Sequence, residues 1–276
     1  MGKKTVVFGS FVVDLMGRTP HLPAAGETVK GTVFKMGPGG KGFNQGVAAH
    51  KAGADVTMVT KLGRDSFADI ALNTMKDLGM KQDRILYSDD TETGCALIMV
   101  DENTSQNEIV VILGSCNTIS DAEVDSLEDL LDGSEYLLTQ LETNVSSVER
   151  IVDIACKKGV KVILNTAPIQ PISDELLSKV DLITPNEVEA EILTGVKVDS
   201  EEAADKAAEW FFHKGVKRVL ITLGGRGVYI NTRDKKGIIP AYKVNAIDTT
   251  GAGDAFNGGL LAALAEDKDI WDAADF

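Results

Sequence analysis

The sequence has few residues of the kinds that bind transition metals or cross-link small proteins. It contains three cysteines and three histidines in 276 residues. Cys95, Cys116 and Cys156 lie far apart and form no C-x-x-C pair, which argues against a zinc knuckle or a disulfide framework and leaves free thiols as the expectation. No histidine has a second potential ligand at metal-binding spacing, so neither a zinc site nor a histidine-based catalytic triad is expected.

Long apolar runs and an excess of positive charge are also missing. No stretch approaches the roughly 20 apolar residues of a membrane helix, and the short apolar run after Lys4 is too short for a signal peptide. Lys and Arg number 28 against 42 Asp and Glu, a net charge of −14. A surface of this charge repels nucleic-acid phosphates and anionic membranes. We therefore expect a cytoplasmic protein whose partners are neither nucleic acids nor membranes.

The sequence is rich in short aliphatic runs that alternate with amphipathic segments. Hydrophobic residues make up 43% of the chain, enough for a core without metal or disulfide support. Continuous apolar runs typical of strands covered on both faces are Val6–Phe8, Val56–Thr60, Tyr136–Leu138, Val160–Leu164, Leu182–Thr184 and Val219–Leu223. Alternation with helical patterns, as at 145–155 and 201–214, predicts parallel pairing through right-handed crossovers. The expected fold is α/β, with a doubly wound, mainly parallel sheet flanked by helices.

Two segments break this alternation. Residues 12–38 contain three prolines and a strand-like stretch, Thr28–Lys35, with no crossover helix after it. Residues 93–113 read as a hairpin with a polar turn at 101–106. We predict that both segments form a small β-layer that projects from the main sheet, the alternative being two ordinary edge strands. An apolar face on such a layer needs covering, by closure over a substrate or by a second subunit.

The segment 248–254, Asp-Thr-Thr-Gly-Ala-Gly-Asp, is the most informative part of the chain. A glycine-rich turn that opens onto a helix presents unpaired N–H groups at the positive end of the helix dipole, which suits an anion. Gly251 and Gly253 allow the backbone to approach a phosphate closely. The carboxylate of Asp254 either accepts a hydroxyl proton beside that phosphate or is an ordinary acidic residue of a first helical turn. The residues alone leave both interpretations open.

A second glycine-rich segment spans residues 37–45. Gly37, Gly39 and Gly42 satisfy the spacing G-x-G-x-x-G, but they do not follow the first strand directly, as a dinucleotide fingerprint requires. A nicotinamide-dependent oxidoreductase is therefore the alternative from a different class. No Walker phosphate loop occurs. We favour a flat backbone platform that admits a sugar ring edge-on, with Asn44 as hydrogen-bond partner of adjacent hydroxyls.

Carboxylates recur where strand-like runs end. Asp14 is expected at the end of the first strand segment, where open α/β sheets bind ligands, and Glu142 follows the run at 136–138. Asn186 and Glu189 begin a helix after the run at 182–184. Their side chains either hold a hydrated magnesium ion or cap the helix, and the sequence does not decide between the two.

Taken together, these motifs resemble the ribokinase (PfkB) family of sugar kinases, and the similarity extends over almost the whole chain. Five segments carry the resemblance in order: Gly-Gly-Lys-Gly-Phe-Asn-Gln (39–45), Asn-Thr-Ala-Pro (165–168), Thr-Pro-Asn-Glu-Val-Glu-Ala-Glu (184–191), Ile-Thr-Leu-Gly-Gly-Arg-Gly (221–227) and Asp-Thr-Thr-Gly-Ala-Gly-Asp (248–254). The first segment has the form found in ribokinases and not that of fructokinases. The resemblance implies an ATP-dependent phosphotransferase with an alcohol acceptor.

The resemblance also implies a role for individual residues. Asp254 is the expected catalytic base, and the N–H groups of Gly251, Ala252 and Gly253 form the expected anion hole. The expected sugar-binding residues are Asp14, Gly40, Lys41, Gly42, Asn44 and Glu142. The expected ATP-binding residues are Asn186, Thr222, Gly224, Gly227 and Gly253. Glu189 is expected to act on Mg²⁺ through water, and Asp248 and Thr250 to offer oxygens to an activating monovalent cation, K⁺.

The expected reaction is transfer of the γ-phosphoryl group of ATP to the primary hydroxyl of a pentose. The resemblance makes D-ribose the first choice of acceptor. The alternative is 2-deoxyribose or another small sugar, because Val12 stands where many ribokinases have an Asn that can bond a sugar hydroxyl. The resemblance implies a homodimer formed through the β-layer at 12–38 and 93–113. It also implies that relatives continue beyond Phe276, so we expect one α/β kinase domain over 1–276 that lacks the family's C-terminal end and leaves the adenine side of the nucleotide site open.

Overall fold

The structure is a computed structural model that describes residues 2–245 and 249–276. Its main feature is an eight-stranded sheet in the order β14-β13-β12-β11-β10-β9-β1-β4. From one edge to the other the strands are β14 (Lys236–Ile239), β13 (Val228–Asn231), β12 (Arg218–Thr222), β11 (Leu182–Ile183), β10 (Lys161–Leu164), β9 (Tyr136–Thr139), β1 (Lys4–Phe8) and β4 (Asp55–Val59). The six strands from β12 to β4 pair in parallel, which confirms the predicted parallel core.

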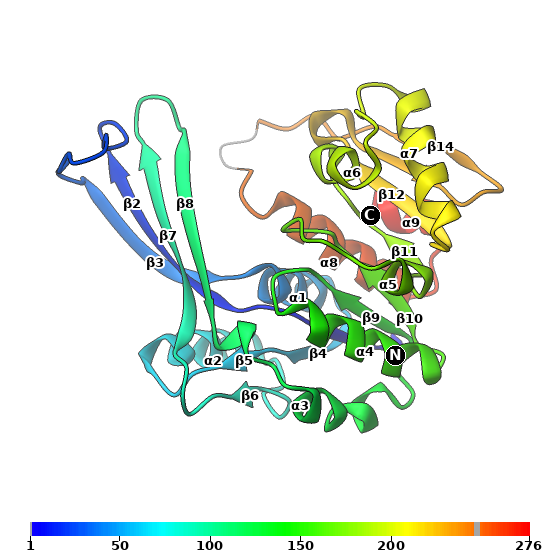
Figure 1. The fold of residues 1–276 in the computed structure, drawn as a ribbon, viewed down its shortest axis with the longest axis horizontal. Coiled ribbons are helices and arrows are strands. Elements are labelled where there is room, and N and C mark those ends of the chain that lie inside the picture. Colours follow the sequence, from blue (N-terminus) through cyan, green and yellow to red (C-terminus); the bar gives the residue numbers. More distant parts are fainter. Residues whose placement is uncertain (1, 246–248) are drawn as a thin grey trace.

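Helices cover both faces of this sheet (Figure 1). One face packs against α3 (Asp121–Asp125), α4 (Val145–Lys157), α5 (Asp174–Ser178), α6 (Glu187–Thr194) and α7 (Glu201–His213). The other face packs against α1 (Lys41–Lys51), α2 (Ser66–Leu78), α8 (Ala252–Ala265) and α9 (Ile270–Asp275). Successive residues of a strand point to opposite faces, so Val6 and Phe8 join the first core and Val7 the second. Burial on both faces explains the continuous apolar runs of the sequence.

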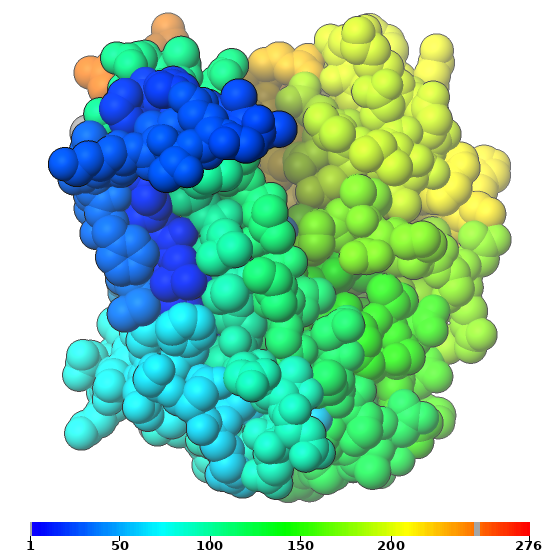
Figure 2. All heavy atoms as spheres, turned by 60° about the vertical axis from the view of Figure 1, so that its left-hand side comes forward, coloured from blue at the N-terminus to red at the C-terminus, as the bar shows by residue number. Residues whose placement is uncertain are grey.

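A second, four-stranded sheet stands beside this body and is called here the small sheet. Its order is β3-β2-β7-β8, with strands β2 (Val12–Thr19), β3 (Val33–Gly39), β7 (Thr93–Asp101) and β8 (Asn107–Gly114). The two segments that break the α/β alternation supply these strands, as expected. In the space-filling view, the small sheet and its blue connection form a wall separated by a recess from the yellow-green part of the body (Figure 2). Two short strands, β5 (Lys61–Leu62) and β6 (Leu86–Tyr87), pair near its base.

Several helices begin where the sequence supplies a cap. Asp65 accepts hydrogen bonds from the first turn of α2, and Ser200 accepts one from Ala203 in α7. Asn144 precedes α4, but its side chain makes no cap bond; it bonds the backbone of Ile119 instead.

One expected strand is misplaced: the stretch 28–32 is not strand, and β3 begins only at Val33. Helix α1 begins at Lys41, inside the second glycine-rich segment, because Gly40 adopts a positive φ of 89° that turns the chain directly into the helix. The antiparallel hairpin β13–β14 lies at the sheet edge, where the sequence patterns predicted no strand. No helix of the described residues is both long and apolar enough to cross a membrane.

Candidate active site

The start of α8 forms the floor of the candidate site. Gly251 precedes the helix with a left-handed φ of 74°, and no side chain of residues 2–245 or 249–276 caps the helix. The N–H of Ala252 donates to the carbonyl of Thr249 at 3.1 Å, so in this structure one of the three expected anion-hole donors is used within the turn. The N–H groups of Gly253 and Asp254 have no acceptor among the described residues. The N-terminus of this 14-residue helix attracts an anion through these donors and the dipole.

Asp254 lies in this first turn, with its carboxylate turned toward α1. Its Oδ2 accepts a hydrogen bond from Asn44 Nδ2 at 3.2 Å, and its Oδ1 accepts one from Gln45 Nε2 at 3.0 Å. Only 8% of Asp254 is exposed. Asp254 is therefore not an ordinary exposed acidic residue of a first helical turn, because neighbouring side chains hold its carboxylate in one place.

Asp14 comes from the small sheet and not from the end of the first main-sheet strand, which corrects the sequence-based expectation. It lies within β2, and the missing side chain of Gly39 on β3 leaves room for its carboxylate: a Cβ there would lie 2.3 Å from Asp14 Oδ1. Phe11 and Val13 belong to the core under α1 and α2. Val12 and Asp14 therefore share the opposite face of the strand.

Glu142 follows β9, as predicted, and is 6% exposed. Its Oε2 accepts hydrogen bonds from the hydroxyl of Ser10 and from the N–H of Lys41, at 2.7 Å for the latter. Glu142 thus fixes the beginning of α1. Burial, the charge of Glu142 and the charge of Asp254 raise the pKa of Asp14, which places all three carboxylates in one electrostatic environment.

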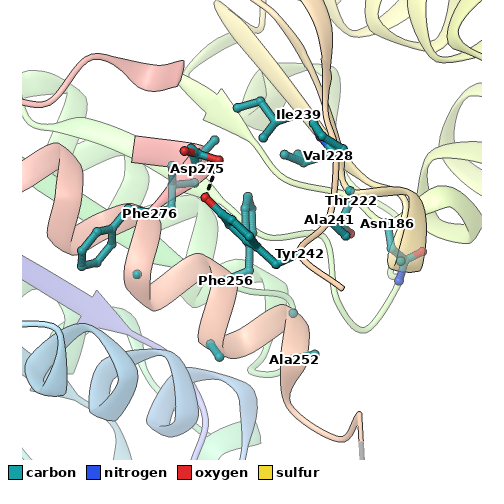
Figure 3. A pocket seen from close by; sticks show the side chains of 18 of the residues that line it. Asn186, Thr222, Val228, Ile239, Ala241, Tyr242, Ala252, Phe256, Asp275 and Phe276 are labelled. Atoms are coloured by element: carbon teal, nitrogen blue, oxygen red, sulfur yellow. Dashed lines mark hydrogen bonds between the residues drawn. The ribbon is translucent and has the colours of Figure 1, made fainter. Parts of the chain in front are cut away.

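A cavity of about 700 Å³ lies between α8, the start of α6 and the edge hairpin (Figure 3). Asn186, Thr222, Gly224 and Gly227 line it, as does Gly253, so the five expected ATP-binding residues come together. Its lining is mostly apolar and includes Tyr242 and Phe256. Tyr242 donates a hydrogen bond to Asp275 at 3.1 Å. The size and lining suit a planar aromatic group with a charged tail directed at α8.

Two smaller cavities connect this space with the small sheet. One of about 190 Å³ shares Asn186, Thr222, Ala252 and Gly253 with the large cavity. A third, of about 590 Å³, is lined by Asp14 and Asn44 and shares Gly251 and Asp254 with the 190 Å³ cavity. The three cavities therefore adjoin one another around the start of α8, and Asp254 lies where the 190 Å³ cavity meets the one beside the small sheet.

Asn186 and Glu189 form a capping box at the start of α6, which is the structural alternative that the sequence left open. The N–H of Glu189 donates to Asn186 Oδ1 at 2.9 Å, and the N–H of Asn186 donates to Glu189 Oε2 at 3.0 Å. Thr166 donates to the same oxygen of Glu189. Within residues 2–245 and 249–276, no group of three or more His, Cys, Asp or Glu side chains is placed to hold a metal ion. Asp248, one of the two expected ligands of a monovalent cation, lies outside the described residues.

Several buried polar residues at the site had no role in the sequence-based account. Gln45, Gln140 and Asn165 form a chain of amides that reaches Asp254. Asn257 accepts a hydrogen bond from Thr184 at 2.6 Å and donates to the carbonyl of Gly253 at 2.8 Å, which supports the first turn of α8. The available signal was position, because Gln140, Asn165 and Thr184 directly follow the ends of parallel strands.

The glycines that matched a dinucleotide fingerprint do not occupy its structural context. Gly37 and Gly39 lie in β3 of the small sheet, and Gly42 lies in α1. The first main-sheet strand is followed by another strand, β2, and not by a helix. A Cβ on Gly42 would lie 2.6 Å from the Cα of Gly9, so this glycine serves the packing of α1 on the preceding loop.

The fold and the site define a phosphotransferase of sugars, and comparison with known proteins identifies the family. The model of the pfkB family of carbohydrate kinases matches residues 3–276. The chain belongs to this family and is a carbohydrate kinase.

Similar proteins include enzymes for two pentoses. The ribokinase of Haemophilus influenzae is 44% identical over 276 residues, covering 100% of this chain and 90% of that protein. The deoxyribokinase of Salmonella typhi is 38% identical over 265 residues, covering 96% and 86% respectively. The solved structure of Arabidopsis thaliana ribokinase complexed with ribose and ATP has a TM-score of 0.90 at 28% identity, covering 99% of this chain and 89% of that one.

Proposed function

We propose that this protein transfers the γ-phosphoryl group of ATP to the primary hydroxyl of D-ribose and so forms ribose 5-phosphate. The family match and the similar ribokinases support a sugar kinase. One observation carries the proposal for the site: three cavities adjoin at the start of α8, and Asp254 lines the two that lie toward the small sheet. ATP in the 700 Å³ cavity and a pentose beside Asp14 meet at this carboxylate.

Phosphoryl transfer requires mainly positioning and stabilisation of charge. On the sugar side, Asp14, Asn44 and Glu142 and the backbone at 40–42 are the groups that hold the pentose. Asp254 takes the proton of the primary hydroxyl as that oxygen attacks the γ-phosphorus in line, and the bond from phosphorus to the bridging oxygen of ADP breaks. The N–H groups at 251–253 stabilise the negative charge of the transferring group, after the turn releases the one now bonded to Thr249.

The proposal includes two metal ions with different tasks. Glu189 would suit an outer-sphere contact with a hydrated Mg²⁺, because its oxygens are already anchored, and the ion would neutralise phosphate charge when ATP is bound. Thr250 and Asp248 would offer oxygens to K⁺, which would act on the loop that carries the anion hole. The hard oxygen donors of these residues suit both cations.

We propose that the small sheet closes over the sugar and joins two subunits in the cytoplasm. Large apolar side chains are exposed on both of its faces: Met36, Leu97 and Val110 on one, and Val33, Ile109 and Val111 on the other. Apolar surface of this kind is covered in most stable proteins. Analytical ultracentrifugation tests the dimer, and a monomer at micromolar concentration contradicts it.

A second candidate substrate, 2-deoxyribose, is favoured by Val12. This residue shares a strand face with Asp14 and is 2% exposed. Its side chain cannot bond a hydroxyl, and one relative at 38% identity is named deoxyribokinase. A coupled assay of ADP release with ribose, 2-deoxyribose, other pentoses and no sugar tests the proposal. Sugar-dependent release that is fastest with ribose is expected, and release independent of any sugar contradicts it.

A further inference from the structure

A chain of three buried amides ends on the carboxylate of Asp254. Gln140 Nε2 donates to Gln45 Oε1 at 2.7 Å, and Gln45 Nε2 donates to Asp254 Oδ1 at 3.0 Å. Gln45 Nε2 also donates to Asn165 Oδ1 at 3.0 Å, and Asn165 Nδ2 donates to the carbonyl of Thr184 at 2.9 Å. The chain thus links α1 to the ends of three central strands, β9, β10 and β11, and to the catalytic turn.

The neighbours of Gln45 allow only one orientation of its amide. Its NH₂ group faces two acceptor oxygens, and its carbonyl faces a donor. A flipped amide would place an oxygen against two oxygens and leave buried groups unpaired, which is costly. Gln45 is 0% exposed and Gln140 is 1% exposed, so water does not substitute easily for either partner.

The backbones of α1 and α8 are also held together at this point. A Cβ on Gly258 would lie 2.6 Å from the carbonyl oxygen of Gln45 and 2.5 Å from the Cβ of Ala48. Gly258 therefore permits an approach of the two helices that no other residue allows. The side-chain bond from Gln45 to Asp254 spans two helices that are already closely packed.

We infer that Gln45 is a positioning residue for the catalytic base and that Gln140 fixes Gln45 in turn. The amide of Gln45 occupies Oδ1 of Asp254 and prevents rotation of the carboxylate, so that Oδ2 remains turned toward Asn44 and the sugar cavity. Gln45 is 0% exposed, so its amide presents no surface to a substrate and can act only through its buried partners. This inference rests on the proposed role of Asp254 as base, and it adds Gln45 as the residue that orients the carboxylate.

The test uses the full-length chain with Gln45→Met, an unbranched substitution of similar volume. At saturating ribose and ATP, kcat is expected to fall on the order of 10- to 100-fold, the cost of a slightly misplaced catalytic group. The KM for ribose is expected to change less than threefold, because the sugar contacts remain. In Asp254→Asn, adding Gln45→Met is expected to cause no further loss, since the group that it orients no longer acts as a base.

The matched control is Asn231→Leu. Asn231 is another buried amide that donates to a carboxylate, Asp205, at 2.9 Å, and it lies outside all three cavities. This variant is expected to lose stability and keep kcat within twofold. If Gln45→Met does not fold, Gln140→Leu is used, and a smaller fall in kcat at unchanged KM is expected.

The outcomes separate this inference from the proposed function. Full kcat in Gln45→Met or Gln140→Leu, with Asp254→Asn inactive, overturns the inference alone. A multiplicative loss in the double variant also overturns it. Full kcat in Asp254→Asn contradicts the proposed function itself.

Discussion

Asn44 and Asp254 are separated by 210 residues in the sequence, yet Asn44 Nδ2 donates a hydrogen bond to Asp254 Oδ2 at 3.2 Å. Each residue belongs to one of the two glycine-rich segments that the sequence singles out. The bond brings the segment assigned to the sugar to the segment assigned to the phosphoryl group. An oxygen between these two residues is within reach of both a hydroxyl-binding amide and a base.

The first prediction concerns Asp254. We expect Asp254→Asn to leave the fold intact and to lower kcat by ~10²–10⁴, the usual contribution of a positioned general base. The amide retains the volume of the carboxylate but cannot accept the hydroxyl proton. Steady-state kinetics at saturating sugar measure the effect, with circular dichroism to verify folding. A variant with nearly the wild-type kcat would show that another group acts as the base.

The second prediction concerns sugar preference. Val12→Asn adds a donor and an acceptor on the strand face shared with Asp14, so we expect kcat/KM for ribose to rise about fivefold, as for a restored hydrogen bond worth ~1 kcal/mol. The preference for ribose over 2-deoxyribose should rise with it. Kinetics with both sugars give the ratio, and an unchanged ratio would mean that Val12 does not face the sugar hydroxyls.

The third prediction concerns the pH dependence of stability. Because burial and two neighbouring carboxylates raise the pKa of Asp14 above its ordinary value of about 4, ionisation of Asp14 costs the folded state free energy. This cost is absent at a pH below the pKa of Asp14 in the unfolded chain, and it grows as the pH rises through the higher pKa of the folded protein. We therefore expect Asp14→Asn to have a higher Tm than the wild type at pH 7.5, with the difference vanishing toward pH 4, and to bind sugar poorly.

Thermal unfolding of both proteins between pH 4 and pH 8 measures this difference. The isosteric change Asp65→Asn is the control: hydrogen bonds from the N–H groups of Thr93, Ala68 and Phe67 lower the pKa of Asp65. Asp65→Asn should therefore have a lower Tm than the wild type at pH 7.5, whereas Asp14→Asn should have a higher one. A lower Tm for Asp14→Asn at pH 7.5 than for the wild type would contradict the account.

The fourth prediction concerns the monovalent cation. We expect K⁺ to raise kcat above the value in Na⁺ or Li⁺, because a cation at Thr250 and Asp248 would align the turn that carries the N–H donors. The chlorides are compared at matched ionic strength. Equal values of kcat in LiCl and KCl would show that K⁺ does not activate the enzyme.

The sequence was informative where structure is local. Continuous aliphatic runs predicted the central parallel strands, and the glycines of 248–254 predicted the turn that opens onto α8. Sequence patterns did not predict the β13–β14 hairpin because β14, Lys-Gly-Ile-Ile, begins with a charged residue and a glycine and so shows no continuous aliphatic run. The sequence does not indicate that α1 begins at Lys41, because glycine usually disfavours a helix. In the structure, Gly40 and Gly42 permit close packing on residues 9–11.

Long-range side-chain pairing was beyond the reach of sequence patterns. Gln45 contacts Asn165 and Asp254, which are 120 and 209 residues away. Nothing in the periodicity near Gln45 signals these partners, because they meet only after the central strands have paired. The location of Asp14 was wrong for a related reason, since the chain leaves the main sheet at Gly9 and enters the small sheet at Val12.

The most direct test of the central claim follows the transferred phosphorus. The protein is incubated with ATP, Mg²⁺, K⁺ and either ribose or 5-deoxyribose, which lacks the accepting hydroxyl, and the products are observed by ³¹P NMR. A phosphomonoester coupled to the C5 protons should form from ribose together with ADP, and none should form from 5-deoxyribose. Phosphorylation of 5-deoxyribose, or ADP release with inorganic phosphate as the only new product, would contradict the account.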